Sequence, residues 1–426
     1  MRYIADLHLH SKYSRACSKD LDLEHNEIWA KKKGIDIVGT GDFTHPAWFR
    51  ELNEKLVEAK PGLFKLQGTR LDSSSARQAD GKVFFMLTTE ISCIYSQGGK
   101  VRRIHLCLFA PDFDSVAKIN SALEARGVNL KSDGRPIMGL HADEVVKIVL
   151  EANPDNMVIP AHAWTPWFSV FGSHSGFDSL EECFGETTKY IKAIETGLSS
   201  DPAMNWRLSA LDDITLISNS DAHSSANLGR EANVFEINES DLSYFEIKKI
   251  IETKDQQKFL YTIEFFPEEG KYHHDGHRAC GINLTPQETK KYHGLCPKCH
   301  KPLTIGVLSR VNDLADRGVD FKPNAIPFKS IVPLPEIISE ILGVGRNSKK
   351  VSNVYESIVS QASEFEVLLD LDYQRLSELV SPELLLAIKN VREQHVRPIA
   401  GYDGEYGVIK TLKEGQVKKA IQDKLI

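Results

Sequence analysis

Long apolar runs are what this 426-residue sequence lacks most clearly. No stretch approaches the roughly 18–20 consecutive apolar residues that a membrane-spanning helix needs, which excludes that class of protein. The opening MRYIADLHLHS has no apolar stretch after its basic residue, so we expect no signal peptide and a cytoplasmic location. Internal repeats and low-complexity tracts are also missing. With 41% hydrophobic and 26% charged residues, the chain is expected to be globular.

Cysteine is scarce, and its count of seven is odd. An odd number argues against a disulfide framework. Three cysteines cluster between residues 280 and 299 and suggest a bound metal. The remaining four are scattered and are interpreted as small core residues: Cys17, Cys93, Cys107 and Cys183.

An overall excess of positive charge is missing too, because the net charge is −7. The distribution of charge is more informative than its sum. Residues 271–330 hold ten Lys and Arg against five acidic residues, so this segment carries +5 and the rest of the chain −12. A local basic segment is the pattern expected from phosphate binding, although +5 over sixty residues is modest.

Apolar runs of strand length alternate with helix-period segments up to about residue 240. The predicted strands are 3–9, 35–41, 83–89, 103–110, 156–161, 190–196, 214–220 and 234–237. The predicted helices include 23–33, 48–59, 142–152 and 243–253. This alternation predicts an α/β fold, either a closed parallel barrel or a doubly wound sheet.

The pattern changes near residue 265, and a chain of this length is expected to hold two or three domains. A His- and Gly-rich stretch leads into a short basic Cys/His segment, which ends in a Pro-punctuated stretch. Residues 335–395 are predicted to be mostly helical, and 396–411 form a Gly-rich, loop-like tail. The expected domains are a barrel over 1–265, a zinc-ribbon-like module over 266–325 and a helical domain over 326–426.

Histidine and acidic residues lie at or near the ends of successive predicted strands. They are Asp6, His8, His10, Asp42, His45, Glu90, His105, His162, Asp221 and His223. A single His at a strand end usually has its hydrogen bonds satisfied and no further role. So many His and acidic residues at strand ends indicate one shared site, because the carboxyl ends of barrel strands converge on one mouth. Imidazoles and carboxylates together suit Zn, Mn or Fe, and a carboxylate such as Glu90 can bridge two ions for phosphoester cleavage.

Six motifs, in this order along the chain, resemble the polymerase and histidinol phosphatase (PHP) superfamily. They are Asp6-x-His8-x-His10, Gly41-Asp42, Glu90, His105, Pro160-Ala-His162 and Ser220-Asp221-Ala-His223. The resemblance implies a distorted seven-stranded (β/α) barrel with two to three divalent ions (Zn, Mn, Mg or Fe). It also implies that a first ion is bound by His8, His10, Glu90 and Asp221, which are the expected catalytic residues. A second ion would be bound by Glu90, His105 and His162, and His223 would contribute to a third.

The third ion is the least supported part of this resemblance. Many relatives have a histidine at the position of Ala16, and a second histidine at the position of Phe43, directly after Asp42. A third site therefore requires Asp42 or His45 to supply the missing ligands.

A second metal site is predicted in the basic segment. His277-x2-Cys280, then fifteen residues, then Cys296-x2-Cys299 gives two closely spaced ligand pairs, a spacing close to that of a zinc ribbon. We expect one structural zinc that folds a module too small to have its own core. The alternatives to His277 as fourth ligand are His273, His274, His293 and His300.

Further segments make the whole chain resemble the endonuclease Q family. They are 160–172, 269–280, 296–317, 342–345 and 401–407. The resemblance implies a damage-specific DNA endonuclease that cuts 5′ of deaminated bases (deoxyinosine, deoxyuridine, xanthine) or abasic sites, leaving a 3′-hydroxyl and a 5′-phosphate. The expected partner is damaged DNA. We expect a monomer without membrane contacts, and a sliding clamp is considered as a partner, although no clamp-binding peptide is found before Ile426.

Two segments are candidates for direct DNA contacts. Aromatic residues just after His162 could build a base pocket or wedge, because an enzyme that inspects one base must extrude it; they are Trp164, Trp167, Phe168 and Phe171. An equally favoured explanation is that these aromatic residues pack between the barrel and a neighbouring domain. Gly343-Val-Gly345 before Arg346 and Lys349 resembles a phosphate-binding hairpin loop, with an ordinary helix-to-helix turn at least as favoured.

Two other functions fit parts of the sequence. A PHP-type small-molecule phosphoesterase, such as a histidinol-phosphatase-like enzyme, would need neither the ribbon nor the helical tail. A zinc-ribbon nucleic-acid-binding protein with an inactive barrel is disfavoured by the nearly complete set of ligands.

Overall fold

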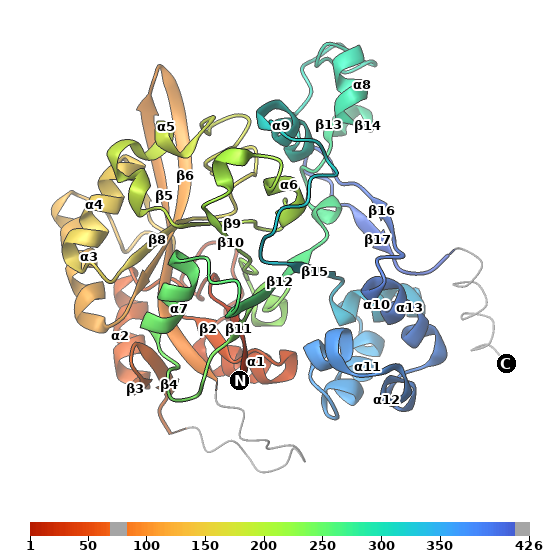
Figure 1. The fold of residues 1–426 in the computed structure, drawn as a ribbon, viewed down its shortest axis with the longest axis horizontal. Helices are drawn as coiled ribbons and strands as arrows, with labels where there is room; N and C mark the ends of the chain where they lie inside the picture. Colours follow the sequence, from red (N-terminus) through yellow and green to blue (C-terminus); the bar gives the residue numbers. More distant parts are fainter. Residues whose placement is uncertain (69–82, 414–426) are drawn as a thin grey trace.

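The computed structural model describes residues 1–68 and 83–413 of an α/β protein. In Figure 1 a barrel occupies the left, a small ribbon module the upper right and a group of C-terminal helices the lower right. Within the described residues, none of the helices has the length and apolar character needed to cross a membrane.

The largest sheet has eleven strands in the order β15-β12-β11-β1-β2-β5-β4-β3, with β6 and β7 beside β5 and β8 beside β6. β9 pairs with β10 in a small separate sheet. The bounds of these strands are β1 Arg2–Asp6, β2 Ile37–Gly39, β3 Leu56–Lys60, β4 Leu63–Leu66, β5 Phe84–Gln97, β6 Lys100–Ala110, β7 Ile137–Met138, β8 Met157–Pro160, β9 Ala193–Glu195, β10 Thr215–Ile217, β11 Ala232–Glu236, β12 Phe259–Phe265 and β15 Phe328–Ile331.

Strand pairing is mixed, so the expectation of an all-parallel sheet is wrong. β1–β2, β2–β5 and β12–β15 are parallel, as predicted for alternating strands and helices. β1–β11, β11–β12, β5–β6 and β6–β8 are antiparallel. The reason is clearest at β5–β6, which are joined only by Gly98 and Gly99, both with positive φ. A two-residue turn of this kind can join only antiparallel strands.

The barrel is closed beyond β8 by single hydrogen bonds rather than by a continuous ladder. Ala163 donates its backbone N–H to Glu195 O at 2.9 Å, which links the segment after β8 to β9. The Ser218 N–H donates to Asn233 Oδ1 at 3.0 Å, which links β10 to β11. The interior holds one hydrophobic cluster that includes Phe84, Phe109 and Phe235. This packed interior supports the mouth above it.

Helices cover the outside of the barrel and form the C-terminal group. Their bounds are α1 Leu23–Lys33, α2 Pro46–Lys55, α3 Phe113–Ala125, α4 Ala142–Ala152, α5 Leu180–Phe184, α6 Pro202–Asn205, α7 Tyr244–Glu252, α8 Pro286–Lys291, α9 Val307–Leu314, α10 Leu334–Leu342, α11 Lys349–Val359, α12 Tyr373–Leu379 and α13 Pro382–Arg392. α1 coincides with its prediction, because Asp22 caps its start and Gly34, at φ 83°, ends it.

The ribbon module and the C-terminal region contain strands as well as helices. β13 (Asp275–His277) and β14 (Ile282–Leu284) form a hairpin in the ribbon. β16 (Arg397–Ile399) and β17 (Val408–Lys410) form another, so the description of 396–411 as a loop-like tail is wrong. The Gly401–Gly407 stretch is the connection between these paired strands. This hairpin lies between the ribbon and the C-terminal helices (Figure 1).

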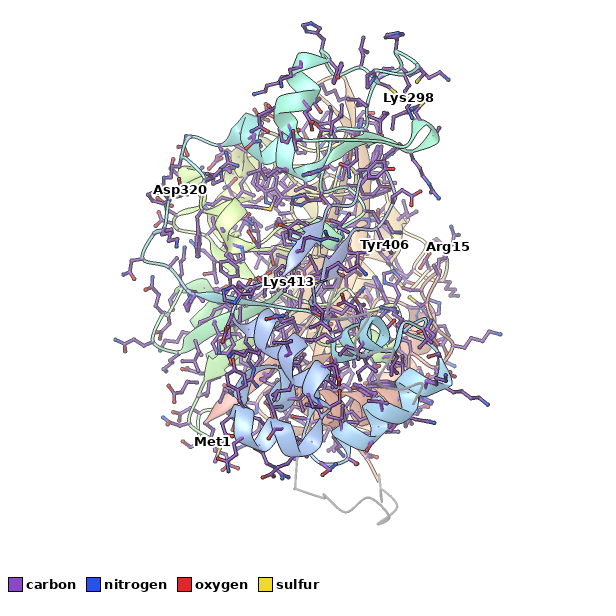
Figure 2. The ribbon with its side chains drawn as sticks, turned by 90° about the vertical axis from the view of Figure 1, so that its right-hand side faces the viewer. Met1, Arg15, Lys298, Asp320, Tyr406 and Lys413 are labelled. Carbon is purple, nitrogen blue, oxygen red and sulfur yellow. The ribbon has the colours of Figure 1, made fainter. Side chains whose placement is uncertain are left out.

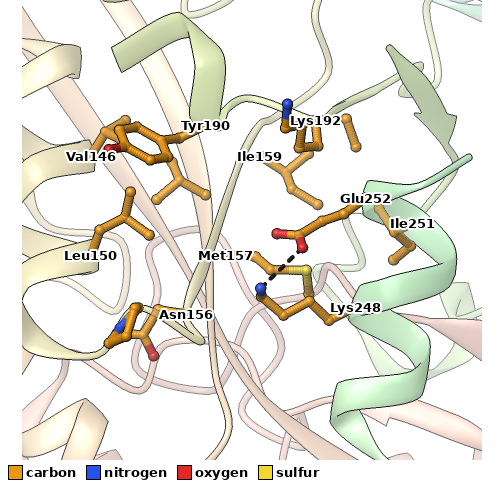
Figure 3. Close-up of a pocket in the computed structure, with 13 residues that line it drawn as sticks. Val146, Leu150, Asn156, Met157, Ile159, Tyr190, Lys192, Lys248, Ile251 and Glu252 are labelled. Carbon is orange, nitrogen blue, oxygen red and sulfur yellow. Dashed lines mark hydrogen bonds and ion pairs between the residues drawn. The ribbon is translucent and has the colours of Figure 1, made fainter. Parts of the chain in front are cut away.

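A cavity of about 240 Å³ lies on the outside of the barrel, between α4 and α7 (Figure 3). Its lining is mostly apolar, including Val146, Leu150 and Ile159, with one ion pair of 3.0 Å between Lys248 and Glu252. No His or Cys lines it. None of its lining residues belongs to a group of side chains that could hold a metal in the described part of the chain, so the catalytic site is sought at the barrel mouth.

Candidate metal centre at the barrel mouth

Six of the predicted ligands meet at one end of the barrel. His8 and His10 follow β1, His162 follows β8 and Asp221 follows β10. Glu90 and His105 lie inside β5 and β6, where Glu90 pairs with Cys107 and His105 with Ser92. The expectation that Glu90 follows its strand is therefore wrong, because the β5–β6 hairpin continues past the barrel.

The first group of potential ligands consists of His8, His10, Glu90 and Asp221, whose ligand atoms lie within 4.8 Å of one another. His10 Nε2 lies 3.1 Å from Asp221 Oδ1 and 3.3 Å from Glu90 Oε2. His8 Nε2 lies 3.7 Å from Glu90 Oε2 and 3.8 Å from Asp221 Oδ1. The set matches the one implied for the first ion.

The second group consists of Glu90, His105 and His162. Glu90 Oε1 lies 2.7 Å from His105 Nδ1 and 3.0 Å from His162 Nε2, and these two nitrogens are 3.2 Å apart. Glu90 thus turns one oxygen to each group. This is the arrangement a carboxylate needs to bridge two cations.

His8 provides a direct test of whether the first group fits a metal. Its Nε2 is buried and has no hydrogen-bond partner in the described part of the chain. Its Nδ1 lies 3.0 Å from Glu195 Oε2, so Nδ1–H donates and the lone pair of Nε2 faces Glu90 and Asp221. An imidazole held by a carboxylate at one nitrogen and unpartnered at the other is typical of a metal ligand. The residues therefore fit a divalent cation.

Asp42 belongs to neither group but supports one of them. Its Oδ1 lies 3.2 Å from His10 Nδ1, and its Oδ2 accepts from the Ser11 N–H at 2.6 Å and from Ser14 Oγ at 2.8 Å. Asp42 thereby orients His10 in the way that Glu195 orients His8. Its predicted role as a ligand stays a prediction.

His45 and His223, predicted for a third ion, also lie outside both groups. The His45 ring stacks on Tyr13 with centroids 4.5 Å apart. The His223 ring lies 4.6 Å from that of His10, and its Nδ1 is 2.9 Å from Asp221 O. His223 therefore borders the first group, and the third ion stays a prediction.

The site carries a surplus of buried carboxylate charge. Burial raises the pKa of Glu90, but the electrostatic attraction of His105 and of the Arg135 guanidinium outweighs burial and holds that pKa well below its ordinary value. Burial lowers the pKa of His10, but hydrogen bonds to Asp221 and Asp42 outweigh it and raise that pKa well above its ordinary value. Protons on His10 therefore balance charge that a divalent cation would neutralise instead.

Three residues of the site have a strained backbone. Asp42, His162 and Asp221 have φ values of 48°, 27° and 47°, in the left-handed region that non-glycine residues rarely adopt. Gly197 permits one of these conformations, because a Cβ built on it would meet the His162 Cβ at 2.5 Å. Strain of this kind is retained where the surrounding structure fixes a functional side chain.

The predicted zinc ligands also come together. The ligand atoms of His277, Cys280, Cys296 and Cys299 lie within 4.8 Å of one another, and Cys299 Sγ is 3.6 Å from His277 Nδ1. None of the four alternative histidines belongs to this group. Cys296 and Cys280 pack with Leu284 and Leu303, a core too small to be stable alone.

The candidate DNA contacts differ in how accessible they are. Trp164 and Phe171 are 1% and 2% exposed, with ring centroids 4.7 Å apart, so both pack inside the protein. Trp167 stacks on His174, and Phe168 lies 4.7 Å from His105. Arg346 is exposed and pairs with Glu336 at 2.7 Å, and Lys349 is exposed at the start of α11.

Comparison with known proteins places this geometry in a family. Residues 333–395 match the family described as MJ0043 C-terminal domain. The uncharacterised protein MJ0043 of Methanocaldococcus jannaschii is 33% identical over 254 residues, 58% of this chain and 31% of that protein, so this chain spans about a third of that relative. The crystal structure of the lesion-specific endonuclease PfuEndoQ from Pyrococcus furiosus is 31% identical with a TM-score of 0.83, covering 100% of this chain and 99% of that one. The chain belongs to the endonuclease Q family.

A second endonuclease Q structure is similar over the same extent. It is a complex with a 27-mer duplex substrate that has an abasic lesion at the active site. It is 32% identical to this chain, with a TM-score of 0.84 and coverage of 99% and 100%. The implied fold of the endonuclease Q family is thereby confirmed for this chain.

Sequence reasoning missed two charged side chains of this endonuclease Q site. Glu195 holds His8, accepts the His162 N–H at 2.8 Å and accepts from Asn219 Nδ2 at 2.9 Å. Its position at the end of predicted strand 190–196 was the available signal. Arg135, whose Nη1 lies 2.9 Å from Glu90 Oε2, sits in an irregular segment between α3 and β7 that shows no motif.

Proposed function

We propose that this protein is a metal-dependent DNA endonuclease that hydrolyses the phosphodiester on the 5′ side of a damaged nucleotide, with a deaminated base or no base. The observation that carries the proposal is the convergence of two ligand groups on Glu90, one on each oxygen. The full-length similarity to endonuclease Q, including a complex with an abasic duplex, supports DNA as the substrate.

The proposed ligands are those the two groups contain. His8, His10, Glu90 and Asp221 would hold one ion, and Glu90, His105 and His162 the other. Divalent cations held there supply Lewis-acid chemistry, favouring the ionisation of water and neutralising phosphate charge. Glu195 and Asp42 fix the tautomers and directions of His8 and His10.

Arg135 adds a cationic group at the mouth. Its side chain is 30% exposed while one nitrogen contacts Glu90. A guanidinium that contacts the Glu90 carboxylate competes with a metal ion for it. A bound anion that pairs with the guanidinium would reduce this competition. We assign it to a non-bridging oxygen of the scissile phosphate, for which its planar donors are suited.

The expected products are a 3′-hydroxyl and a 5′-phosphate, as attack on the phosphate from the side opposite the 3′ oxygen requires. The proposed reaction requires one copy of this chain and one DNA duplex. The sliding clamp, the monomeric state and the identity of the metals stay predictions.

The test uses duplexes that carry one abasic site, deoxyuridine or deoxyinosine, beside an undamaged duplex and a phosphate monoester, with Mn²⁺ or Mg²⁺. We expect a single cut 5′ of each lesion and none in the undamaged duplex. Asp221→Ala should lower cutting by at least about 10³-fold while duplex binding is retained. Hydrolysis of the monoester without any cut at a lesion would refute the proposal.

A further inference from the structure

Cys107 is a buried thiol beside the metal centre that belongs to neither of the ligand groups sharing Glu90. It lies on β6 directly opposite Glu90 of β5, and it is part of the hydrophobic cluster in the barrel interior. Its sulfur nevertheless lies within 4.8 Å of a ring nitrogen of His8 and a carboxylate oxygen of Glu195. The interpretation of Cys107 as a core residue is therefore incomplete.

The donors of Cys107, His8 and Glu195 differ in kind from those of the metal centre. The two groups that share Glu90 offer only imidazole nitrogens and carboxylate oxygens. Carboxylates suit hard cations such as Mg²⁺ and Mn²⁺, and imidazoles suit Zn²⁺ and its neighbours. A thiolate added to one imidazole and one carboxylate shifts the preference to soft cations such as Zn²⁺ and Cd²⁺.

The spacing of these three donors suits a single ion. Bonds of about 2.0–2.3 Å to zinc place its ligand atoms about 3–4 Å from one another. The nitrogen of His8 that faces Glu195 is Nδ1, which lies 3.1 and 3.0 Å from the two carboxylate oxygens. Glu195 is itself held in place, since it accepts from the His162 N–H at 2.8 Å and from Asn219 Nδ2 at 2.9 Å. Within the described residues, Cys107 is the only barrel cysteine in such a group.

His8 cannot serve this group and the proposed first ion at the same time as a neutral ring. For the first ion, Nδ1 carries the proton and donates it to Glu195, and the lone pair of Nε2 is free. A cation bound through Nδ1 needs the lone pair of that nitrogen, so the ring proton moves to Nε2. The Cys107 thiol releases its own proton to solvent when its sulfur binds. With a proton on Nε2, His8 is lost as a ligand of the first ion.

We infer that Cys107, Glu195 and Nδ1 of His8 form an inhibitory site for a thiol-binding divalent cation such as Zn²⁺. Occupation of this site withdraws His8 from the first ion. The inference rests on the proposed function, because His8 is one of the ligands proposed there. Zn²⁺ in excess of what the ribbon binds should therefore inhibit the enzyme. Mn²⁺, which binds thiolates weakly, should not inhibit and should compete with the inhibition.

The first test measures inhibition of the full-length enzyme by Cd²⁺, which binds thiolates more tightly than Zn²⁺, in the presence of Mn²⁺. The substrate is a duplex with one abasic site. We expect the Cd²⁺ concentration that halves the cutting rate to rise in proportion to the Mn²⁺ concentration. At fixed Mn²⁺, Cys107→Ala should raise it at least tenfold.

The matched control for this test is Cys93→Ala. Cys93 is a buried cysteine on the neighbouring strand β5 and belongs to none of the ligand groups, so its removal should leave the Cd²⁺ concentration within twofold of the wild-type value. Equal inhibition of the wild type and Cys107→Ala would overturn the inference. So would inhibition that does not depend on Mn²⁺.

The second test detects the Cd²⁺–sulfur bond directly and needs no DNA. The ribbon also contains thiols, but they lie in another part of the molecule. Figure 2 shows the ribbon at the top, marked by Lys298, and Met1, the residue before β1, near the bottom. Cd²⁺–thiolate bonds absorb ultraviolet light, so the absorption of the barrel site is obtained as the difference between the wild type and Cys107→Ala. We expect the wild type to bind one more Cd²⁺ per chain than this variant.

Cys107→Ser provides an independent check, because it keeps the size of the side chain and removes only the soft donor. It should lack the same absorption and carry the expectation should Cys107→Ala not fold. Identical Cd²⁺ absorption in the wild type and the folded variant would overturn the inference. A wild-type enzyme that cuts no lesion would refute the proposed function instead, and the titration without DNA would still decide whether the cation site exists.

Discussion

Single carboxylates decide how the metal centre of this protein is held. Glu195 and Asp42 each occupy the second nitrogen of a histidine whose other nitrogen faces Glu90 and Asp221. Such partners raise the basicity of the ligand and stop the ring from turning. The ligand motif therefore depends on two acidic residues outside the two ligand groups that share Glu90.

We predict that Glu195→Gln weakens metal binding more than catalysis. The amide keeps the shape of the carboxylate but removes the charge that supports His8, so the apparent metal affinity should fall about 10–100-fold. Activity measured against Mn²⁺ concentration should recover at high Mn²⁺, whereas that of Asp221→Ala should not. Glu252→Gln, in the ion pair on the outside of the barrel, is the control (Figure 3). A Mn²⁺ dependence identical to that of the wild type would contradict this role.

A buried glutamate away from the ligand groups gives the stability of the fold a pH dependence. Glu264 is fully buried, and burial raises its pKa to about 8 from 4.5, although Thr262 and Thr196 donate hydrogen bonds to it at 2.5 and 3.0 Å. Because the folded pKa is raised, the stability contributed by neutral Glu264 is complete below about pH 4.5. It is lost as the pH rises through 8, at up to about 1.4 kcal/mol per pH unit.

We predict that Glu264→Gln becomes more stable relative to the wild type as the pH rises from 5 to 9. The amide cannot ionise, so only the wild type bears the cost of a buried charge. Urea unfolding at several pH values measures the difference in unfolding free energy. The same series with Glu252→Gln should show no such trend, and a pH-independent difference for Glu264→Gln would argue against an ionising buried Glu264.

At the scale of secondary structure, individual strands and helices could be predicted from local sequence patterns better than the pairing of strands could. The runs around β1, β2 and β8 and the cap residues of α1 are visible in the sequence, because strand alternation and helix capping are local. The antiparallel pairing of β5 and β6 depends on the turn at Gly98 and Gly99. The sequence prediction missed this pairing, because it relied on the alternation of strands and helices, which favours parallel strands. Arg135 reaches Glu90 across 45 residues of chain, a contact that no local pattern encodes.

The ribbon is the element whose existence depends most on a metal. Its core is limited to Leu284, Cys296 and Leu303 with a few partly buried neighbours, so ligand binding must supply most of its folding free energy. We predict that Cys296→Ser loses one zinc per chain and weakens duplex binding, while the metals of the barrel are retained. Metal analysis and duplex titration measure both effects.

The control for the ribbon is a cysteine of the barrel. Cys183→Ala removes a thiol that belongs to none of the ligand groups, so zinc content and duplex affinity should stay unchanged. If Cys296→Ser kept its full zinc content, one of the histidines outside the group would have to serve as the fourth ligand.

The whole molecule combines a net charge of −7 with a basic segment of +5. The ribbon lies on the side of the barrel opposite α3 and α4 in Figure 1. A polyanion should therefore approach from the ribbon side and be repelled elsewhere. If the protein acts on DNA as proposed, this asymmetry should orient the duplex before any contact with the lesion is made.

We predict that Lys290→Gln with Lys291→Gln, two exposed positions on α8, weakens duplex binding in a salt-dependent way. Each lost phosphate contact should reduce the slope of log K against log salt by about 0.9. The matched control is Lys118→Gln with Lys147→Gln on α3 and α4, which removes the same charge from the opposite side. Turnover at saturating duplex should be unchanged in both double variants, because neither pair approaches the metal ligands. Equal slopes for the two pairs would show that the duplex senses only the net charge of the molecule.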